Sequence, residues 1–478
     1  MLRFHNSLTR RVEPFEPLDP PKVKVYNCGP TVYSSPHIGN YRAFVFTDLL
    51  RRYLDFRGYD VTQVMNLTDV GHLRDDGADA GEDRMALAAR KEKLDPWKIA
   101  EKYTAEFFAG LDLLNVRRAH HYPRATDHVA EMIEIIEGLI EKGHAYVVDH
   151  DVYFDVSSFE RYGALSGNTA DDALVEGASE RVSDEVRAKK RSPRDFALWK
   201  SDAHHIMQWD SPWGRGFPGW HIECSAMSRK YLGDTIDIHT GGIDNTFPHH
   251  ECEIAQSEAF SGQPFVRTWL HVAHLNLSGE KMSKSEGNVL VPQDLVDEGF
   301  TPAQVRYYLL SVHYRQPMTF SREALKGSAQ ALDRLRNLLD SLTHKAAHGS
   351  SDQTSIGVVE AVDEARARFV AALDDDLNAS LGLAALFELM NALNQRSDLS
   401  RADADVALRF LREIDEVLGV FPRAADAALD QEIEAKIAAR EEARRARDFE
   451  TADRIRDELA RDGIELLDTP EGLRWRRR

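Results

Sequence analysis

A short stretch near the start of the chain, CGPTVYSSPHIGN at residues 28–40, combines a thiol, an imidazole and two glycines. A helix beginning at Pro36-His37 would present free backbone N–H groups and the positive end of its dipole, which suits phosphate binding. Gly39 would let a nucleotide approach closely. His37 would donate a hydrogen bond to a phosphate whose charge grows during displacement. A purely structural histidine is the alternative interpretation.

A second pattern that suits phosphate chemistry is LSGEKMSKSEGN at residues 277–288. Lys281 and Lys284 lie three apart among small residues, so they can fold over a triphosphate and neutralise it as pyrophosphate leaves. A solvated lysine turn is the alternative. Alone, this spacing indicates phosphate chemistry and nothing narrower.

Candidate metal ligands occur in GWHIECSAM (219–227) and DIHTGGIDNTFPHHECEIAQ (237–256). His249 and Glu253 are four residues apart, so on a helix they share one face. Together with two thiolates they would complete a tetrahedral zinc site. That set of four is Cys28, Cys224, His249 and Glu253.

Other ligand sets fit the same residue types equally well. Cys252, His250 and Glu251 lie beside the chosen pair, and each offers a suitable ligand atom. Cys28 and Cys224 would also be unremarkable as ordinary buried thiols, the commonest fate of a free cysteine. The residues alone leave this choice open.

The elements around these residues predict an α/β fold. VKVYNC (23–28) reads as a strand, residues 38–57 have helical apolar spacing, and DVTQVMNLT (60–68) reads as a second strand. Strand, helix and strand in this order form parallel strands joined by a right-handed crossover. A doubly wound parallel sheet binds ligands beyond the carboxyl ends of its strands, which is where Cys28 and His37 would lie.

In the rest of the chain the expected secondary structure changes several times. Strands of the same sheet are expected to resume after an irregular insertion, and a helical bundle should follow. The expected segments are helices over 96–145, the insertion over 146–215, strands at 234–242 and 268–277, helices beyond about 320, and a linker at 343–355 (THKAAHGSSDQTS).

Length and composition limit the class of protein. At 478 residues the chain should contain three domains, because one core stops growing at about 250 to 300 residues. No run approaches the roughly 20 apolar residues that cross a membrane, and the N-terminus lacks the apolar core of a secretory signal. Three cysteines fit a reducing compartment, so we expect the cytoplasm. The net charge of −19 argues against nonspecific coating of nucleic acid.

Taken together, the motifs resemble those of a known enzyme family. HIGN and KMSKS resemble the two signatures of class I aminoacyl-tRNA synthetases, which activate an amino acid with ATP. CGPTVY, GWHIECSAM and FPHHECEIAQ are similar to the zinc-binding segments of the cysteinyl-tRNA synthetase family. The similarity spans nearly the whole chain, through to ADRIRDELARDGIELLDTPEGLRW at 452–475.

The resemblance implies an activity and a set of site residues. L-cysteine would be joined to tRNA(Cys) through a cysteinyl-adenylate, using ATP with Mg²⁺. One Zn²⁺ per chain would recognise the substrate thiol and so exclude serine, which makes an editing domain unnecessary. The implied residues are Cys28, Cys224, His249 and Glu253 for zinc; His37, Asn40, Lys281 and Lys284 for catalysis; these four with Gly39 and Asp244 for ATP; and Thr68 and Trp220 for the amino acid.

The resemblance also implies a domain plan. A Rossmann-like catalytic domain would occupy 1–320, with an insertion at about 115–218. A stem-contact region and helical bundle would follow at 321–425, and an anticodon-binding domain at 426–478. A monomer is expected. Trp475 and the arginines after it would stack on and neutralise nucleotides.

Two departures from the family pattern stand out. Asn40 replaces a second histidine of the first signature, so any donation from that position comes from an amide. NLTDVGHLRDDGADAGEDRM (66–85) lacks the Asp-Asp-Lys run that commonly follows the TD pair, which leaves the role of residues 71–86 unassigned. Two rival functions remain: a cysteine ligase with an amino-sugar acceptor, and a zinc-containing RNA-binding protein without catalysis.

Overall fold

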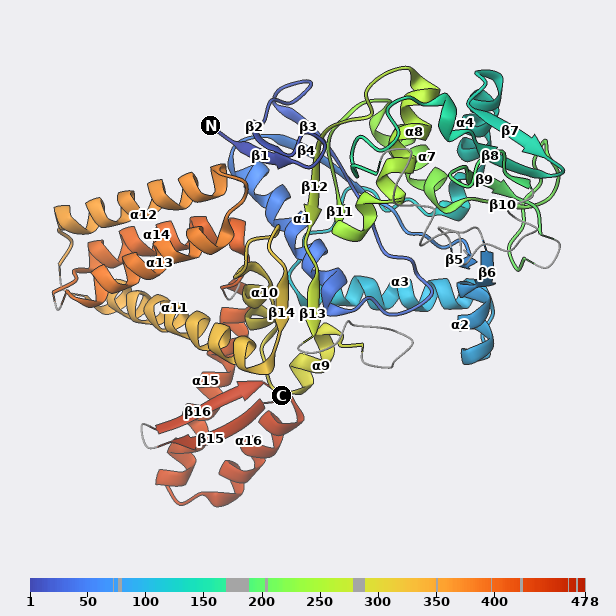
Figure 1. The fold of residues 1–478 in the computed structure, drawn as a ribbon. Helices are drawn as coiled ribbons and strands as arrows, with labels where there is room; N and C mark the ends of the chain where they lie inside the picture. The colour runs from blue at the N-terminus through green and yellow to red at the C-terminus, as the bar shows by residue number, and fades with distance from the viewer. Residues whose placement is uncertain are drawn as a thin grey trace.

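The structure is a computed structural model, shown in Figure 1. It describes residues 1–71, 73–75, 80–168, 189–202, 205–277, 289–349, 351–396, 398–421, 424–462, 464–469 and 472–477. No helix in these ranges is both long enough and apolar enough to cross a lipid bilayer.

A four-stranded parallel sheet forms the centre of the N-terminal half (Figure 1). The predicted strand–helix–strand unit is confirmed, because α1 (Ile38–Phe56) joins two neighbouring parallel strands. The strand expected over 268–277 is interrupted at Ala273 and His274, where Arg42 binds both carbonyls. The sheet runs in the order β12 (Val266–Val272), β11 (Ile236–Gly242), β3 (Lys22–Asn27) and β4 (Asp60–Met65).

Helix α1 begins beyond the carboxyl end of β3, and its apolar residues belong to the main core. His37 is its N-cap and Asn40 completes a reciprocal capping box, so the predicted helix start is confirmed. The helix is followed by Gly58, whose φ of 83° is the left-handed conformation that commonly terminates helices. Apolar residues such as Val45 and Leu49 recur at helical spacing and are buried against the sheet.

The segment between β4 and β11 contains helices and a separate sheet. The helical stretch expected over 96–145 is divided in two, because Asn115 adopts a φ of 53° and the chain then runs beside β4. Met65 N–H donates to the carbonyl of His121 there at 3.0 Å. The elements are β5 (Leu73–Asp75), β6 (Ala80–Asp83), α2 (Arg84–Glu92), α3 (Pro96–Leu113), the short 3₁₀ turn η2 (Ala125–His128), α4 (Val129–Glu141) and α7 (Trp220–Leu232).

That separate sheet is antiparallel and lies within the expected insertion. Its order is β10 (Phe217–Pro218), β9 (Phe196–Lys200), β8 (Asp151–Phe154) and β7 (Ala145–Val148), with η3 (Val156–Ser158) after β8.

Short elements connect the parallel sheet to the helical C-terminal region. The hairpin of β1 (Arg3–Asn6) and β2 (Arg11–Pro14) is antiparallel, whereas β13 (Leu275–Leu277) and β14 (Met318–Phe320) pair in parallel. Between β13 and β14 lie α9 (Pro292–Asp297) and α10 (Pro302–Leu310), whereas η4 (Ile243–Thr246) and α8 (His249–Ser261) connect β11 to β12 within the parallel sheet.

The predicted helical bundle is present, but its linker is shorter than expected. Helix α11 (Arg322–His348) continues through the first half of the segment 343–355, because Leu342 is buried in the core and the following Lys and Ala residues favour helix. The linker therefore starts only at Gly349. The remaining bundle helices are α12 (Ile356–Asp374), α13 (Ala379–Asn394) and α14 (Arg401–Leu418).

A small unit at the end of the chain has its own core. Ile433, Ile455, Leu459 and Ile464 form an apolar cluster separate from the main core. The elements are α15 (Ala424–Arg445), α16 (Phe449–Arg461) and the antiparallel hairpin of β15 (Ile464–Thr469) and β16 (Gly472–Arg477). In Figure 1 this unit lies beyond the bundle and away from the parallel sheet.

By contrast, the bundle and the sheet share one core. Buried side chains of α1, α10 and α14 belong to the same apolar cluster. The fully buried guanidinium of Arg306 donates to Asp48 on α1 at 2.5 Å and to the carbonyl of Leu418 at 2.7 Å. Arg52 donates to the same Asp48 carboxylate at 2.7 Å. The C-terminal end of α14 is thus fixed to α1 by buried charge-assisted bonds.

Candidate active site

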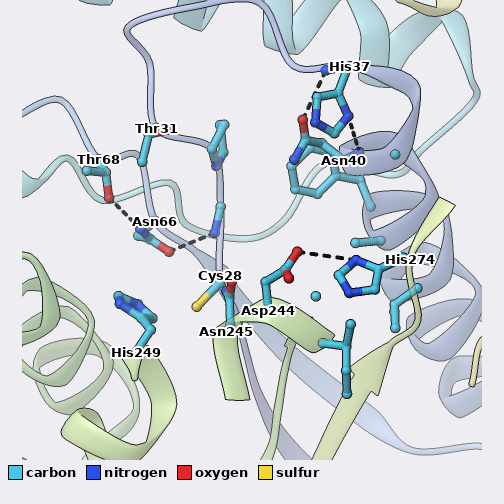
Figure 2. A pocket seen from close by; sticks show the side chains of 18 of the residues that line it. Cys28, Thr31, His37, Asn40, Asn66, Thr68, Asp244, Asn245, His249 and His274 are labelled. Carbon is cyan, nitrogen blue, oxygen red and sulfur yellow. Dashed lines mark hydrogen bonds and ion pairs between the residues drawn. The ribbon is translucent and has the colours of Figure 1, made fainter. Parts of the chain in front are cut away.

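A pocket of about 280 Å³ opens beyond the carboxyl ends of β3, β11 and β12, at the N-terminus of α1. This is the position that a doubly wound sheet predicts. Figure 2 shows side chains from these elements directed into one space. Eight of the sequence-predicted residues line it: Cys28, His37, Gly39, Asn40, Thr68, Trp220, Asp244 and His249.

The start of α1 presents two hydrogen-bond donors at this pocket. Asn40 N–H donates to His37 Nδ1 at 3.2 Å, so a neutral His37 carries its proton on Nε2. The Asn40 side-chain oxygen accepts from His37 N–H at 3.0 Å, which leaves its NH₂ group as the donor. Both side chains therefore suit an anion placed at the positive end of the helix dipole.

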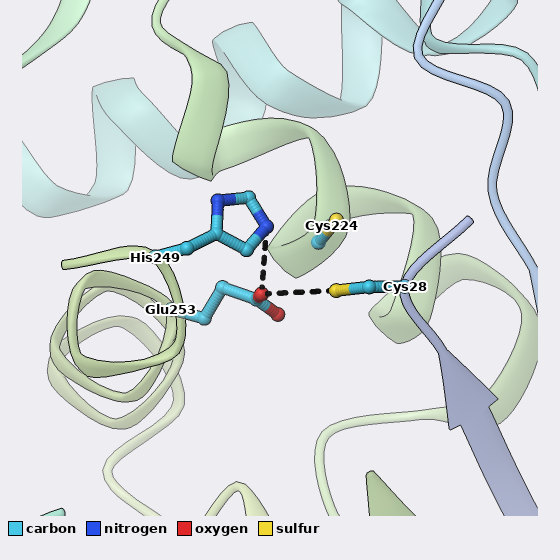
Figure 3. Close-up of side chains that lie close together, drawn as sticks. All are labelled: Cys28, Cys224, His249 and Glu253. Atoms are coloured by element: carbon cyan, nitrogen blue, oxygen red, sulfur yellow. Dashed lines mark hydrogen bonds and ion pairs between the residues drawn. The ribbon is translucent and has the colours of Figure 1, made fainter. Parts of the chain in front are cut away.

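Four potential metal ligands meet beside the pocket. Their ligand atoms all lie within 4.8 Å of one another (Figure 3). His249 Nε2 is 3.1 Å from Glu253 Oε1, as expected of residues four apart on α8. The ligands come from three elements, because Cys28 follows β3, Cys224 belongs to α7, and His249 and Glu253 belong to α8.

His249 and Glu253 each shift the pKa of the other towards its charged form. Burial lowers the pKa of His249, but hydrogen bonds and charge from Cys224 and Glu253 outweigh it and raise the pKa to about 10. Burial raises the pKa of Glu253, but His239 and His249 outweigh it and lower the pKa to about 2. The bond to Cys28, together with burial, raises the pKa of the Cys224 thiol well above its usual range. A divalent cation bound here would displace the protons of His249 and the thiols, because metal ligands bind in their deprotonated forms.

Two of the alternative ligands face elsewhere. Cys252 Sγ lies 3.5 Å from the Tyr162 hydroxyl, and the Glu251 carboxylate accepts from the backbone N–H groups of Gly163 and Ser166, both at 2.8 Å. Neither belongs to a candidate metal group within the described residues. These contacts argue against Cys252 and Glu251 as ligands.

A third alternative, His250, lies close to the same thiol. Its Nε2 is 3.2 Å from Cys28 Sγ, and it belongs to a second, overlapping group with Cys28, His239 and Glu253. His250 Nδ1 is 2.8 Å from Nε2 of His271. The first group contains two thiols and the second only one, which matters because soft sulfur ligands favour zinc.

Sequence reasoning missed His239 and Glu223. His239 Nε2 is 3.0 Å from Glu253 Oε2, and Glu223, fully buried, accepts from Thr68 Oγ1 at 2.9 Å. Residues 236–241 of β11 are all buried, so the strand has no alternation of buried and exposed residues that would distinguish His239 as a site residue. The signal for Glu223 was its place beside Cys224.

The remaining predicted residues have different surroundings. Asp244 Oδ2 is 3.3 Å from His274 Nδ1 at the mouth of the pocket (Figure 2). The Trp220 ring lies 4.7 Å from the His249 ring, between centroids. Lys281 and Lys284 belong to the segment 278–288, which lies outside the described residues. The last residue, Arg478, also lies outside them.

Known proteins are similar to this chain over its whole length. Residues 14–330 match the family described as tRNA synthetases class I (C) catalytic domain, and residues 368–422 match the DALR domain. The cysteine–tRNA ligase of Symbiobacterium thermophilum is 50% identical over 483 residues, covering 100% of this chain and 99% of that protein. The cysteine–tRNA ligase of Geobacillus thermodenitrificans is 47% identical, with the same coverage of both.

Solved structures share the fold at low identity. Methionyl-tRNA synthetase of Mycobacterium tuberculosis, bound by methionyl-adenylate, superposes with a TM-score of 0.60 at 16% identity, over 83% of this chain and 92% of that chain. A leucyl enzyme–tRNA complex from Agrobacterium radiobacter gives a TM-score of 0.61 at 13% identity, over 85% of each chain.

Proposed function

The chain belongs to the cysteine–tRNA ligase family of class I aminoacyl-tRNA synthetases, which charge tRNA with cysteine at the expense of ATP, and we propose that it recognises cysteine by its sulfur. Zn²⁺ would be held by Cys28, Cys224, His249 and Glu253. The observation that carries this proposal is that Cys28 and His249 belong both to the ligand group and to the lining of the pocket.

The donor set fits zinc and the discrimination that the reaction requires. Serine is smaller than cysteine, so a pocket cannot exclude it by shape, and apolar pockets discriminate such small differences only about 10- to 200-fold. When bound, zinc supplies a Lewis acid that a thiolate ligates much better than a neutral hydroxyl does. Two thiols, one imidazole and one carboxylate are its usual ligand types.

The residues at the start of α1 suit the activation step. The cysteine carboxylate attacks the α-phosphate of ATP, and pyrophosphate leaves. His37 Nε2–H, the Asn40 amide and the helix dipole stabilise the added negative charge. We assign Lys281 and Lys284 to the departing phosphates on the basis of the signature alone. Mg²⁺ accompanies ATP.

Three further residues are assigned from their positions around the pocket. Asp244, 71% exposed at the mouth, would bind the ribose. Trp220 would border the amino acid, since its ring lies against His249. Thr68, held by Glu223, would line the same side. Gly39 leaves space for ATP at the first turn of α1.

We assign the binding of tRNA(Cys) to the C-terminal part of the chain. The stem would contact residues 321–425, which include the DALR match, and the anticodon would contact residues 426–478. The catalytic domain is then 1–320. We propose a monomer that acts in the cytoplasm.

A ligase that passes cysteine to an amino sugar is disfavoured. Such an acceptor is small, and it gives no role to a helical bundle followed by a separate terminal unit. Offering labelled cysteine with both acceptors should give labelled tRNA only. Label on the amino sugar would contradict the assignment.

Cysteine-dependent exchange of pyrophosphate into ATP tests the central proposal. Zinc-loaded protein should exchange with cysteine and far less with serine. Chelated protein should lose the preference, and added Zn²⁺ should restore it. An undiminished preference in demonstrably zinc-free protein would refute zinc-based selection.

A further inference from the structure

One cationic side chain in the pocket belongs to neither signature. Among the described residues that line the pocket, Arg84 is the only arginine or lysine. It lies in the segment 71–86, whose sequence departs from the family pattern and to which no role was assigned. Its guanidinium remains charged at any working pH.

The surrounding residues hold Arg84 at the pocket. Its Nη1 donates to the Tyr33 hydroxyl at 2.9 Å, and its guanidinium carbon lies 5.7 Å from the centre of the Tyr33 ring. Tyr33 also lines the pocket and precedes His37 by four residues. Arg84 is therefore tied to the loop that leads into α1.

The backbone that carries Arg84 is fixed from the other side. Arg84 is the first residue of α2, and its neighbour Asp83 caps that helix by accepting from the N–H groups of Met85 and Ala86 at 2.6 and 3.0 Å. Asp83 Oδ2 also lies 2.8 Å from Nε2 of His205, which precedes β10. The insertion thus helps to position this helix start.

One feature of this position is electrostatically unfavourable for the fold. A cation in the first turn of a helix faces the positive end of the dipole, which is electrostatically unfavourable. The side chain is only partly buried. An anion bound in the pocket would offset that unfavourable charge, because the planar guanidinium matches phosphate oxygens two at a time.

We propose that Arg84 binds the triphosphate of ATP, with Tyr33 orienting its guanidinium. The inference rests on the proposed function for the identity of the nucleotide. His37, Gly39 and Asn40 line the same small pocket, so a phosphate at the start of α1 lies within the space that Arg84 borders. Arg84 thereby supplies a fixed positive charge from outside the two signatures.

The test compares Arg84→Gln, Arg84→Lys and Tyr33→Phe with Lys91→Gln. Lys91 is an exposed residue near the end of the same helix that does not line the pocket, so its substitution removes an equal charge elsewhere. Arg84→Gln should raise the KM for ATP in pyrophosphate exchange by roughly tenfold or more, as expected for a lost hydrogen bond to a charged group. The KM for cysteine should change less than about twofold, which a general structural defect would not produce.

The other variants refine the result. Arg84→Lys keeps the charge but not the planar fork, so its KM for ATP should fall between those of the wild type and Arg84→Gln. Tyr33→Phe should give a smaller increase, and Lys91→Gln none. Thermal unfolding midpoints of all four should match that of the wild type.

Three results would overturn the inference. The first is a KM for ATP in Arg84→Gln no higher than in Lys91→Gln. The second is an equal rise in the KM for cysteine. The third is an effect confined to the KM for tRNA in aminoacylation, which would assign Arg84 to the acceptor end instead.

Calorimetric binding of ATP with Mg²⁺ separates this inference from the proposed function, because it needs no cysteine. Weaker ATP binding by Arg84→Gln together with an absence of cysteine-dependent exchange in the wild type would refute the function and leave Arg84 as an ATP ligand. Normal wild-type exchange with unchanged ATP binding by Arg84→Gln would refute the inference alone.

Discussion

At the scale of single residues, the three cysteines have different surroundings. Cys28 and Cys224 converge with His249 and Glu253, whereas Cys252 contacts Tyr162 on another side of α8. Their identities and spacing do not reveal this difference. It arises because α7 and α8 are in contact and bring Cys224, His249 and Glu253 together beside Cys28, which follows β3 (Figure 3).

Cys224→Ala and Cys252→Ala therefore form a matched pair. Both remove a buried thiol from a helix, so their effects on packing should be similar. Cys224→Ala should lose stoichiometric zinc and the preference for cysteine over serine, and Cys252→Ala should keep both. Zinc content by elemental analysis, with exchange assays on each amino acid, decides the matter. Equal zinc loss in the two variants would contradict the ligand assignment.

His239→Phe tests the partner of a proposed ligand. His239 Nε2 hydrogen-bonds Glu253, while its Nδ1 has no hydrogen-bond partner among the described residues. Phenylalanine keeps the stacking on Trp269, where the ring centroids lie 4.6 Å apart. Because such partners orient metal ligands, zinc affinity should fall about 10- to 100-fold.

A chelator competition assay measures that loss. His239→Gln is the comparison, since its amide can still donate to Glu253, and it should retain most of the affinity. Unchanged affinity in His239→Phe would mean that Glu253 needs no support from β11.

At the scale of elements, one carboxylate links the starts of two helices of the bundle. Asp403 accepts from the N–H and hydroxyl of Ser355 at the start of α12, at 2.7 and 2.9 Å, and from Ser400 N–H at the start of α14, at 3.0 Å. Burial raises the pKa of Asp403, but these bonds outweigh it and hold the pKa below its usual 3.8. The ionised form is therefore the stabilising one.

Asp403→Asn should lower the free energy of unfolding by about 1 kcal/mol at pH 7, the usual worth of a cap. Because the folded pKa is depressed, the contribution is complete above the unfolded pKa and is lost as pH falls towards the folded pKa. The difference from the wild type should hold from pH 7 to about pH 5 and shrink at lower pH.

Urea unfolding across this pH range checks the prediction, with faster amide exchange expected in the first turns of α12 and α14. Asp405→Asn, on the same helix, is the control and should show neither effect. A pH-independent difference would mean that the charge of Asp403 is not involved.

Elements with strong periodicity were predictable, and those decided by distant contacts were not. Helix α1 and strands β3, β4 and β11 follow from apolar spacing. The end of α11 was misjudged because Ser, His and Gly near 350 suggested a loop, whereas burial of Leu342 extends the helix. His239 could not be found from a strand buried on both faces. Arg84 lines the pocket because α2 begins next to Tyr33, a contact between distant parts of the chain that no local pattern predicts.

At the scale of the whole molecule, the terminal unit is separable and the bundle is not. The apolar cluster of α15, α16 and β15 is distinct from the main core. The bundle, however, shares its core with the sheet, and Arg306 ties α14 to α1. Functional dissection should therefore cut after Phe421 and not before the bundle.

Deleting residues 422–478 should impair the transfer of cysteine to tRNA but not the activation of cysteine with ATP. Cysteine-dependent exchange should stay within about twofold of the wild type, because the pocket and main core are untouched. The KM for tRNA should rise at least roughly tenfold with loss of a charged, salt-sensitive contact. Charging kinetics at two salt concentrations measure this, and an unchanged KM for tRNA would contradict the anticodon assignment.

The sheet order has a consequence for how the polypeptide is made. β3 is an inner strand, but its neighbour β11 is not synthesised until the ribosome has reached Ile236–Gly242. Until then β3 has one unpaired edge, which invites association with other nascent chains. α8, with His249 and Glu253, emerges just after that strand, so a truncated translation product ending before it cannot assemble the proposed zinc site at all.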